Sequence, residues 1–342
     1  MNTEVKNKKT FIGIDVSKLT LDVSILTSKN EHDYKRFENT LAGYVEINQW
    51  LLDHKSFTYS TSLICMEHTG LYTRELISYL MQQRANVWME SALHLKRSMG
   101  ITRGKSDKVD SYRIARYAMT NQDKAKLVEL STSTLQRLKD LMTNRERLLK
   151  NLQSLKIATQ ELIRVDKKIG KEIASINESA IKGLLKSKEK VENRMLEVIN
   201  ADENLKKLFA LITSVKCVGD ILATELIVYT NGFTRMQNTR QLACYCGVAP
   251  FEHSSGTSIR GRIGTSNFAN MKLKTTLHMA AVSATRYVPD IKQYYERKVS
   301  EGKHKMTVIN AIRNKLLHRI IAVLKRGEPY QENYPKINLE LS

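Results

Sequence analysis

Four acidic residues lie where a chain of alternating strands and helices can bring them together. Asp15 ends one short apolar run, and Glu67 ends a second one. Asp107 and Asp110 are three residues apart at the start of a helical pattern, so both project from one face of that helix. Because strand ends and a helix start can meet at one edge of a sheet, we expect the four carboxylates to form one cluster.

Such a cluster has a defined chemistry. Four carboxylates of like charge repel each other, and each then resists ionisation. Two divalent cations about 4 Å apart remove this conflict and stabilise the attacking and leaving oxygens when a phosphodiester is cut. Ligands that are all oxygens favour Mg²⁺, with Mn²⁺ as the alternative, over zinc. The four acids therefore predict a metal-dependent site for cleaving nucleic acid.

Each acid taken alone has a simpler interpretation. Asp15 can be an ordinary strand-end residue, and Glu67 can cap the helix that follows. Asp107 can be an N-cap in competition with Ser106, and Asp110 can be a first-turn residue favoured by the helix dipole. The order of the set, two strand acids followed by Asp-x-x-Asp, is what favours a shared site.

Basic residues surround the acidic pair. Cations beside metal-binding acids would hold the nucleic-acid backbone while the metals do the chemistry, although a solvated basic loop is the simpler alternative. The five are Lys96, Arg97, Arg103, Lys105 and Lys108.

The charge of the whole chain points to a polyanionic partner. Lys and Arg number 55 against 35 Asp and Glu, a net charge of +20, and residues 251–342 hold 16 basic against 7 acidic residues. Phosphate neutralisation releases counterions and dominates affinity for nucleic acid. A merely soluble cationic surface would not require this uneven distribution, so we expect DNA as partner.

A second candidate site lies in the loop-like stretch 247–264. It holds four glycines, a proline, four hydroxyl residues and two arginines. Glycines permit close backbone approach, and Arg260 and Arg262 can clamp phosphate oxygens. A serine in such a loop can act as a nucleophile, but composition alone leaves Ser254 and Ser255 open as turn residues. Upstream, Gly219 turns one helix into another, which suits either a phosphate contact or a plain interhelical turn.

Hydrophobic patterning predicts three regions and a tail. Residues 1–125 have the order of three strands, helix, strand, helix, strand and helix, which predicts an α/β domain with a mixed sheet. Residues 126–210 form a helical, coiled-coil segment. Residues 211–326 form a mostly helical domain that contains the serine loop, and 327–342 form a loose tail.

The middle region is predicted to be a long antiparallel hairpin or coiled coil. Leucines and a methionine recur at a/d spacing from Leu135 to Leu152, and a second helical stretch runs from about Lys186 to Leu211. The reversal is expected near Gly170–Gly183, the only glycines between Lys105 and Val218. Such a segment serves either oligomerisation or as an intramolecular spacer.

Weaker features of the sequence indicate the cellular compartment of the protein. The four cysteines are too few and too scattered for a disulfide framework, and they lack zinc-finger spacing. The polar N-terminus has no apolar signal core, and no apolar run approaches the ~20 residues of a membrane span. We therefore expect a cytoplasmic protein without a membrane partner.

Taken together, these segments resemble one family. FIGIDVSK, CMEHTG and KSDKVDSYRIARYA resemble the DEDD-type, RuvC-like domain of the insertion-sequence transposases of the one-ten family. LITSVKCVGDILATELI and YCGVAPFEHSSGTSIRGR resemble the C-terminal transposase domain of that family. The resemblance covers about residues 10–285. It implies an RNase H-like fold for residues 1–125 and metal binding by Asp15, Glu67, Asp107 and Asp110.

The resemblance also implies a mechanism. The family serine stands immediately before the glycine, which assigns the nucleophile to Ser255, with Ser254 as the fallback. Members of the family cut and rejoin DNA, some are guided by a structured bridge RNA, and they assemble as oligomers. A dimer or tetramer, DNA and a guide RNA are therefore the expected partners. Lys272 and Lys274 keep positive charge after the loop, whereas the glycine common in the family is replaced there.

Two other functions remain as alternatives. A RuvC-like endonuclease of the junction-resolvase type would explain the acids and the charge, but it would hydrolyse with water and need no serine. A non-catalytic nucleic-acid scaffold would use only the basic surfaces. Replacing Ser255 separates the recombinase from the nuclease, and replacing Asp15 separates an enzyme from a scaffold.

Overall fold

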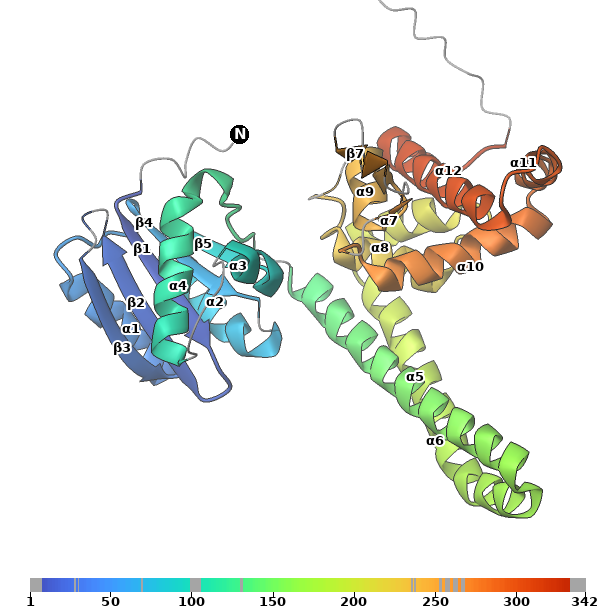
Figure 1. Cartoon of the computed structure of the whole chain (residues 1–342), viewed down its shortest axis with the longest axis horizontal. Coiled ribbons are helices and arrows are strands. Elements are labelled where there is room, and N and C mark those ends of the chain that lie inside the picture. The colour runs from blue at the N-terminus through green and yellow to red at the C-terminus, as the bar shows by residue number, and fades with distance from the viewer. Residues whose placement is uncertain are drawn as a thin grey trace, which may run out of the picture. The chain divides into compact units, whose positions relative to one another are not determined.

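The chain forms two compact units, Met1–Leu130 and Ser131–Ser342 (Figure 1). The structure is a computed structural model. It describes residues 8–27, 29, 31–68, 70–98, 106–129, 132–234, 236, 238–251, 254–255, 259–260, 264–265 and 268–332, with the backbone alone at 254–255 and 259–260. We call the two parts the N-terminal and the C-terminal unit.

The N-terminal unit is built on a five-stranded mixed sheet in the order β3-β2-β1-β4-β5. Strand β1 pairs antiparallel with β2 and parallel with β4, and β4 pairs parallel with β5. The strands are β1 (Thr10–Val16), β2 (Thr20–Thr27), β3 (His32–Glu38), β4 (Ser62–Glu67) and β5 (Val87–Glu90). The predicted mixed sheet is confirmed, and the arrangement fits an RNase H-like domain.

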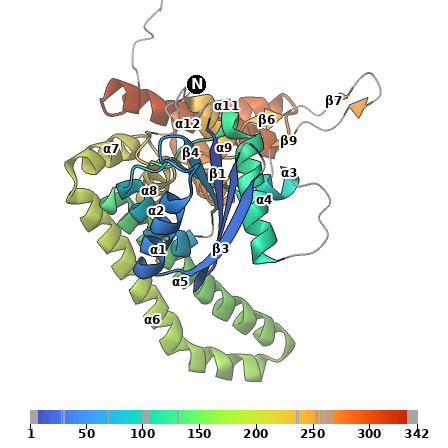
Figure 2. The ribbon, with the colours of Figure 1, turned by 90° about the vertical axis from the view of Figure 1, so that its left-hand side faces the viewer.

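Helices cover both faces of this sheet (Figure 2). The helical elements are α1 (Leu41–Asp53), η2 (Gly70–Thr73), α2 (Arg74–Gln82), α3 (Ala92–Ser98), α4 (Asp107–Thr120) and η3 (Gln122–Lys124). Alternate residues of β1 point to opposite faces. Ile12 and Ile14 join the core under α1 and α2, whereas Phe11 joins the core under α4.

The C-terminal unit begins with a long helical hairpin, α5 (Ser133–Val165) and α6 (Lys167–Asn200). The predicted hairpin is present, but the predicted position of its turn was wrong. The chain reverses at Asp166, which caps α6 by accepting hydrogen bonds from the backbone N–H groups of Lys168 and Ile169. Gly170 and Gly183 both lie inside α6.

Close packing explains the first of these glycines. A β-carbon at Gly170 would come within 2.5 Å of the backbone of Ile163 on α5, so the bare glycine lets the two helices approach just beyond the turn. The second helical stretch also starts earlier than predicted, and it is broken at Ala201–Asp202, where Asp202 caps the next helix.

The rest of the unit is mostly helical: α7 (Glu203–Thr213), α8 (Asp220–Tyr229), α9 (Thr239–Tyr245), α10 (Met271–Tyr287), α11 (Pro289–Ser300) and α12 (Lys305–Arg326). Two short ribbons lie between α9 and α10. In one, β6 (Pro250–Phe251) pairs with β9 (Gly264–Thr265); in the other, β7 (Ser254–Ser255) pairs with β8 (Ile259–Arg260). One continuous core joins the ends of the hairpin to these helices, from Leu135 to Val323. None of the described helices has the length and apolar character to cross a bilayer.

Candidate active site

A single close approach places the acidic helix on the sheet. A β-carbon at Gly13 on β1 would lie 2.1 Å from the carbonyl oxygen of Ser111 and 2.3 Å from the nitrogen of Ala115. Helix α4 therefore rests directly on β1 at the one position without a side chain. A buried hydrogen bond of 2.8 Å between the hydroxyls of Ser24 on β2 and Ser111 secures the same contact.

This packing brings the start of α4 over the carboxyl ends of β1 and β4. Asp15 follows Phe11 and Gly13 on the face that α4 covers, and Glu67 follows Leu63 and Cys65 on that face of β4. Asp15 is half-buried, and Glu67 is also partly covered. The two strand acids are thus on the side of the sheet from which Asp107 and Asp110 approach.

The electrostatics of Asp15 show that the acids act on one another. Burial, followed by the negative charges of Asp110, Asp107, Asp22 and Glu67, raises the pKa of Asp15 to about 6. All four predicted acids therefore belong to one electrostatic cluster, because three of them disfavour ionisation of the fourth.

A fifth acid in this cluster was missed by the sequence reading. Asp22 on β2 is the direct cross-strand partner of Asp15, and it is 2% exposed. Like charges opposite each other on neighbouring strands are destabilising. The available signal was the polar position in the otherwise apolar run TLDVSILT, which places Asp22 on the face opposite to Leu21 and Val23.

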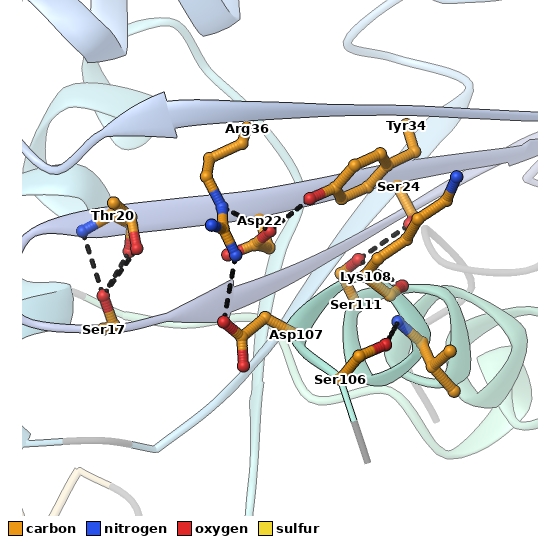
Figure 3. A network of polar contacts seen from close by, with 11 residues as sticks. Ser17, Thr20, Asp22, Ser24, Tyr34, Arg36, Ser106, Asp107, Lys108 and Ser111 are labelled. Atoms are coloured by element: carbon orange, nitrogen blue, oxygen red, sulfur yellow. Dashed lines mark hydrogen bonds and ion pairs between the residues drawn. The ribbon is translucent and has the colours of Figure 1, made fainter. Parts of the chain in front are cut away.

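A cation from β3 compensates this buried carboxylate (Figure 3). The Arg36 guanidinium donates to Oδ1 of Asp22 at 3.0 Å through Nε and to Oδ2 of Asp107 at 3.0 Å through Nη2. The Tyr34 hydroxyl donates to the same Oδ1 of Asp22 at 2.5 Å. Arg36 thereby links the buried acid of the sheet to the exposed first residue of α4.

Each acid of the pair on α4 forms an ion pair with an arginine. Ser106 is the N-cap, since its hydroxyl accepts from the backbone N–H of Val109. Asp107 is thus the first helical residue rather than the cap. Asp110 pairs with Arg113 on the same helix at 3.0 Å. Among the side chains that the structure describes, no three acid, His or Cys groups converge closely enough to hold a metal ion.

The basic residues around the acids have different positions. Lys96 and Arg97 lie in the last turn of α3, and Lys108 lies on α4 with its ammonium 4.9 Å from the centre of the Tyr34 ring. Arg103 and Lys105 fall outside the described residues.

The serine loop is carried by the C-terminal unit. Ser254 and Ser255 form β7, in which Ser255 pairs with Ile259 and Ser254 pairs with Arg260. Their side chains, that of Arg260 and the whole of Arg262 are outside the description. The ribbon nevertheless brings the backbones of Ser254 and Arg260 opposite each other.

The two predicted lysines lie on the first turn of α10. Lys272 is exposed and forms an ion pair with Glu146 of α5. The ammonium of Lys274 donates to the Thr265 hydroxyl at 2.8 Å, and burial followed by the charge of Arg313 lowers the pKa of Lys274. Only Lys274 therefore contacts a strand that flanks the loop.

Comparisons with known proteins find two family models, which match separate stretches of the chain. The family model of the DEDD-type transposase domain, described as "Transposase", matches residues 12–165. A second family model, described as "Transposase IS116/IS110/IS902 family", matches residues 209–296. The first match contains the four acids, and the second contains both ribbons.

Similar proteins extend over the same regions. The chain is 28% identical to a "Pilin gene-inverting protein" of Moraxella lacunata over 95% of this chain and 98% of that protein. It is 26% identical to a "Transposase for insertion sequence element IS1111A" of Coxiella burnetii over 66% of this chain and 68% of that protein. A protein of insertion element IS110 from Streptomyces coelicolor is 30% identical over 42% of this chain and 36% of its own length. The chain belongs to the IS116/IS110/IS902 family of transposases and is a DNA transposase or recombinase.

Proposed function

We propose that this enzyme cuts and rejoins DNA strands with Ser255 as nucleophile and with divalent metal bound at Asp15, Glu67, Asp107 and Asp110. The observation that carries the proposal is the approach of these acids to Asp15, whose pKa is raised by burial and by the charges of Asp110, Asp107 and Glu67. The family membership supplies the reaction class.

The acids fit a hard divalent cation by their donor chemistry, because every candidate ligand is a carboxylate oxygen. When bound, Mg²⁺ would stabilise the charge that develops on the phosphate and the leaving oxygen. In the described structure Asp107 and Asp110 are turned to Arg36 and Arg113. To hold a metal, Asp107 and Asp110 would have to leave these two ion pairs, so Arg36 and Arg113 serve as their counter-ions in the structure described.

The proposed serine step conserves the phosphodiester energy. The Ser255 hydroxyl loses its proton to solvent, and its Oγ forms a bond to phosphorus. The bond from phosphorus to the leaving deoxyribose oxygen breaks, and that oxygen takes up a proton. Attack by a hydroxyl of a second DNA strand on the phosphoserine reverses these bond changes and joins the new strand.

Two partners complete the proposal. The net charge of +20 and the family resemblance suit a structured guide RNA in addition to DNA. The acids and the serine belong to separate units, and the hairpin of α5 and α6 carries exposed apolar residues. We infer an oligomer in which protomers are joined through the hairpin and supply acid and serine sites to the same DNA.

Covalent trapping tests the chemistry. Purified protein is incubated with Mg²⁺, labelled DNA spanning the ends of the DNA segment that encodes the chain, and RNA transcribed from its flank, and is then denatured. We expect labelled DNA attached to wild-type protein and no adduct with Ser255→Ala or Asp15→Asn. Cleaved ends without an adduct, unchanged by Ser255→Ala, would instead establish a water-using endonuclease.

A second candidate is inversion of a DNA segment between two recombination sites. It is favoured by the pilin gene-inverting relative, which matches over 98% of its length. A plasmid with two sites in inverted orientation distinguishes the outcomes, because inversion exchanges the flanks and transposition moves the segment to a new location.

A further inference from the structure

A buried cation lies in the C-terminal unit, close to the ribbon of β6 and β9 from which the serine loop extends. Arg313 of α12 is 6% exposed, and no carboxylate of the described residues forms an ion pair with it. Burial lowers the pKa of Arg313, with no compensating acid. A buried, unpaired guanidinium is costly, so its retention calls for a ligand that supplies negative charge.

Two polar side chains hold the guanidinium. Nη2 of Arg313 donates to Nδ1 of His278 at 2.6 Å, and Nη1 donates to Oδ1 of Asn310 at 3.4 Å. The Nε–H group is buried and has no hydrogen-bond partner among the described residues. Because His278 accepts at Nδ1, its ring is neutral with the proton on Nε2, and both burial and Arg313 lower the pKa of His278.

A second cation lies one helical turn away from the histidine. Lys274 and His278 are four residues apart on α10, so they share a face, and Lys274 is close enough to Arg313 for the two cations to repel. Gly247 lies beside this lysine: a β-carbon there would clash with Cβ of Ala269 at 2.6 Å and would lie 3.3 Å from Cδ of Lys274.

These groups meet at the base of the ribbon that leads into the serine loop. The Asn310 amide donates to the carbonyl of Val248, two residues before β6, at 2.8 Å. Lys274 donates to the side chain of Thr265 in β9, which pairs with Pro250 of β6. Lys274 is therefore fixed to β9, and Arg313 is linked through Asn310 to the chain just before β6, on the two sides of the segment containing Ser255.

We infer that Arg313 and Lys274, with His278 as the residue that positions Arg313, bind a phosphodiester of nucleic acid beside the ribbon of β6 and β9, at the base of the serine loop. A phosphate suits the arrangement because its negative charge can neutralise both cations at once. The inference rests on the proposed function, since Val248 and Thr265, which Asn310 and Lys274 contact, flank the segment that contains Ser255. It assigns a role to Arg313 and His278 that sequence spacing did not suggest.

The test separates binding from chemistry. All variants are made in full-length Ser255→Ala protein, and affinity for a labelled duplex DNA and for a single-stranded RNA of the same sequence is measured by anisotropy over a range of salt concentrations. We expect Arg313→Met and Lys274→Met each to weaken binding about tenfold and to reduce the slope of log Kd against log salt by about one. Arg194→Met, at an exposed arginine paired with Glu197, is the matched control and should change neither.

Thermal unfolding of the same proteins gives a second readout. Without nucleic acid, Arg313→Met should unfold at a higher temperature than its parent, because an uncompensated buried charge is removed; a purely structural arginine would give the opposite shift.

In the binding measurement, a loss of affinity confined to DNA or to RNA identifies which nucleic acid supplies the phosphate, and an equal loss shows that both can. Folded Arg313→Met and Lys274→Met proteins with unchanged affinity and salt slope for both probes would overturn the site. Adduct formation with Ser255 restored reports on the proposed function independently.

Discussion

Gly13 lies directly beneath Ser111, so that the acidic helix and the central strand touch through backbone atoms. The contact sets the depth at which α4 rests on the sheet. Asp15 is two residues after Gly13 on β1, so this contact also determines how closely the carboxylates of α4 approach Asp15.

Gly13→Ala should consequently damage both stability and the site. The added methyl group has backbone on every near side and cannot be accommodated by a rotamer change, so we expect a loss of about 3 kcal/mol in the free energy of unfolding. Gly183→Ala in α6 is the control, because nothing lies within 4 Å of its β-carbon position. That substitution should stabilise the protein by about 0.5–1 kcal/mol. Chemical denaturation of both variants measures the difference, and equal effects would contradict the packing argument.

Stability should depend on pH through Asp15. Its pKa of about 6 lies above the ordinary value, so the folded state holds the proton more tightly than the unfolded chain. This contribution is full below about pH 4, declines as the pH rises, and is lost above about pH 6. Asp15→Asn should remove the decline and stabilise the metal-free protein at neutral pH by about 1–2 kcal/mol, reduced by solvent screening of this half-buried group.

Mg²⁺ should reverse the order of stability of the wild-type protein and the Asp15→Asn variant. At neutral pH the cation should raise the melting temperature of the wild-type protein and leave Asp15→Asn unchanged, because metal binding requires the ionised carboxylate. Asp123→Asn, an exposed acid of the same unit, serves as control and should respond as the wild type does. A wild-type protein indifferent to Mg²⁺ and Mn²⁺ would count against the proposed metal site.

Arg36 should be required mainly because of Asp22. Arg36→Met leaves a carboxylate that is 2% exposed with the Tyr34 hydroxyl as its remaining described partner. We expect a measurable loss in the free energy of unfolding, moderated by the exposure of Arg36 itself. Adding Asp22→Asn should recover most of it, as a double-mutant cycle by urea denaturation would show. Failure of the second substitution to rescue the first would mean that Arg36 acts elsewhere.

The hairpin should mediate self-association. Ile169 and Ile176 of α6 are 49% and 64% exposed, an unusual pair of apolar residues to leave in water. Changing both to serine should shift the mass measured by light scattering toward the monomer. Lys182→Ser, at an exposed lysine paired with Glu178, should not. A wild-type protein that is monomeric at all concentrations would exclude the interface.

The sequence was informative where chain periodicity determines position. The apolar runs that they close placed Asp15 and Glu67 at strand ends, and the three-residue spacing placed Asp107 on one helix face with Asp110. Ser106 and Asp107 competed for the cap, and the hydroxyl of Ser106 is the group that accepts the N–H bond. Local rules were sufficient for these features because each depends on neighbours a few residues away.

Features that depend on contacts between distant segments were missed. Asp22 was passed over because its role depends on pairing with β1 and on an arginine from β3. Arg313 gave no signal, since its burial results from packing against α10. The hairpin turn was assigned to glycines, although an aspartate caps it and Gly170 serves helix contact.

The core of the C-terminal unit takes only the ends of the hairpin, the first turns of α5 and the last turns of α6. The helical arm between these ends extends away from this core and packs mainly against itself. Removing the same number of turns from both helices would therefore shorten the arm without altering the core that carries the ribbon of β6 and β9. In the proposed oligomer, a change in the length of the arm would alter the spacing between protomers and leave the chemical groups as they are.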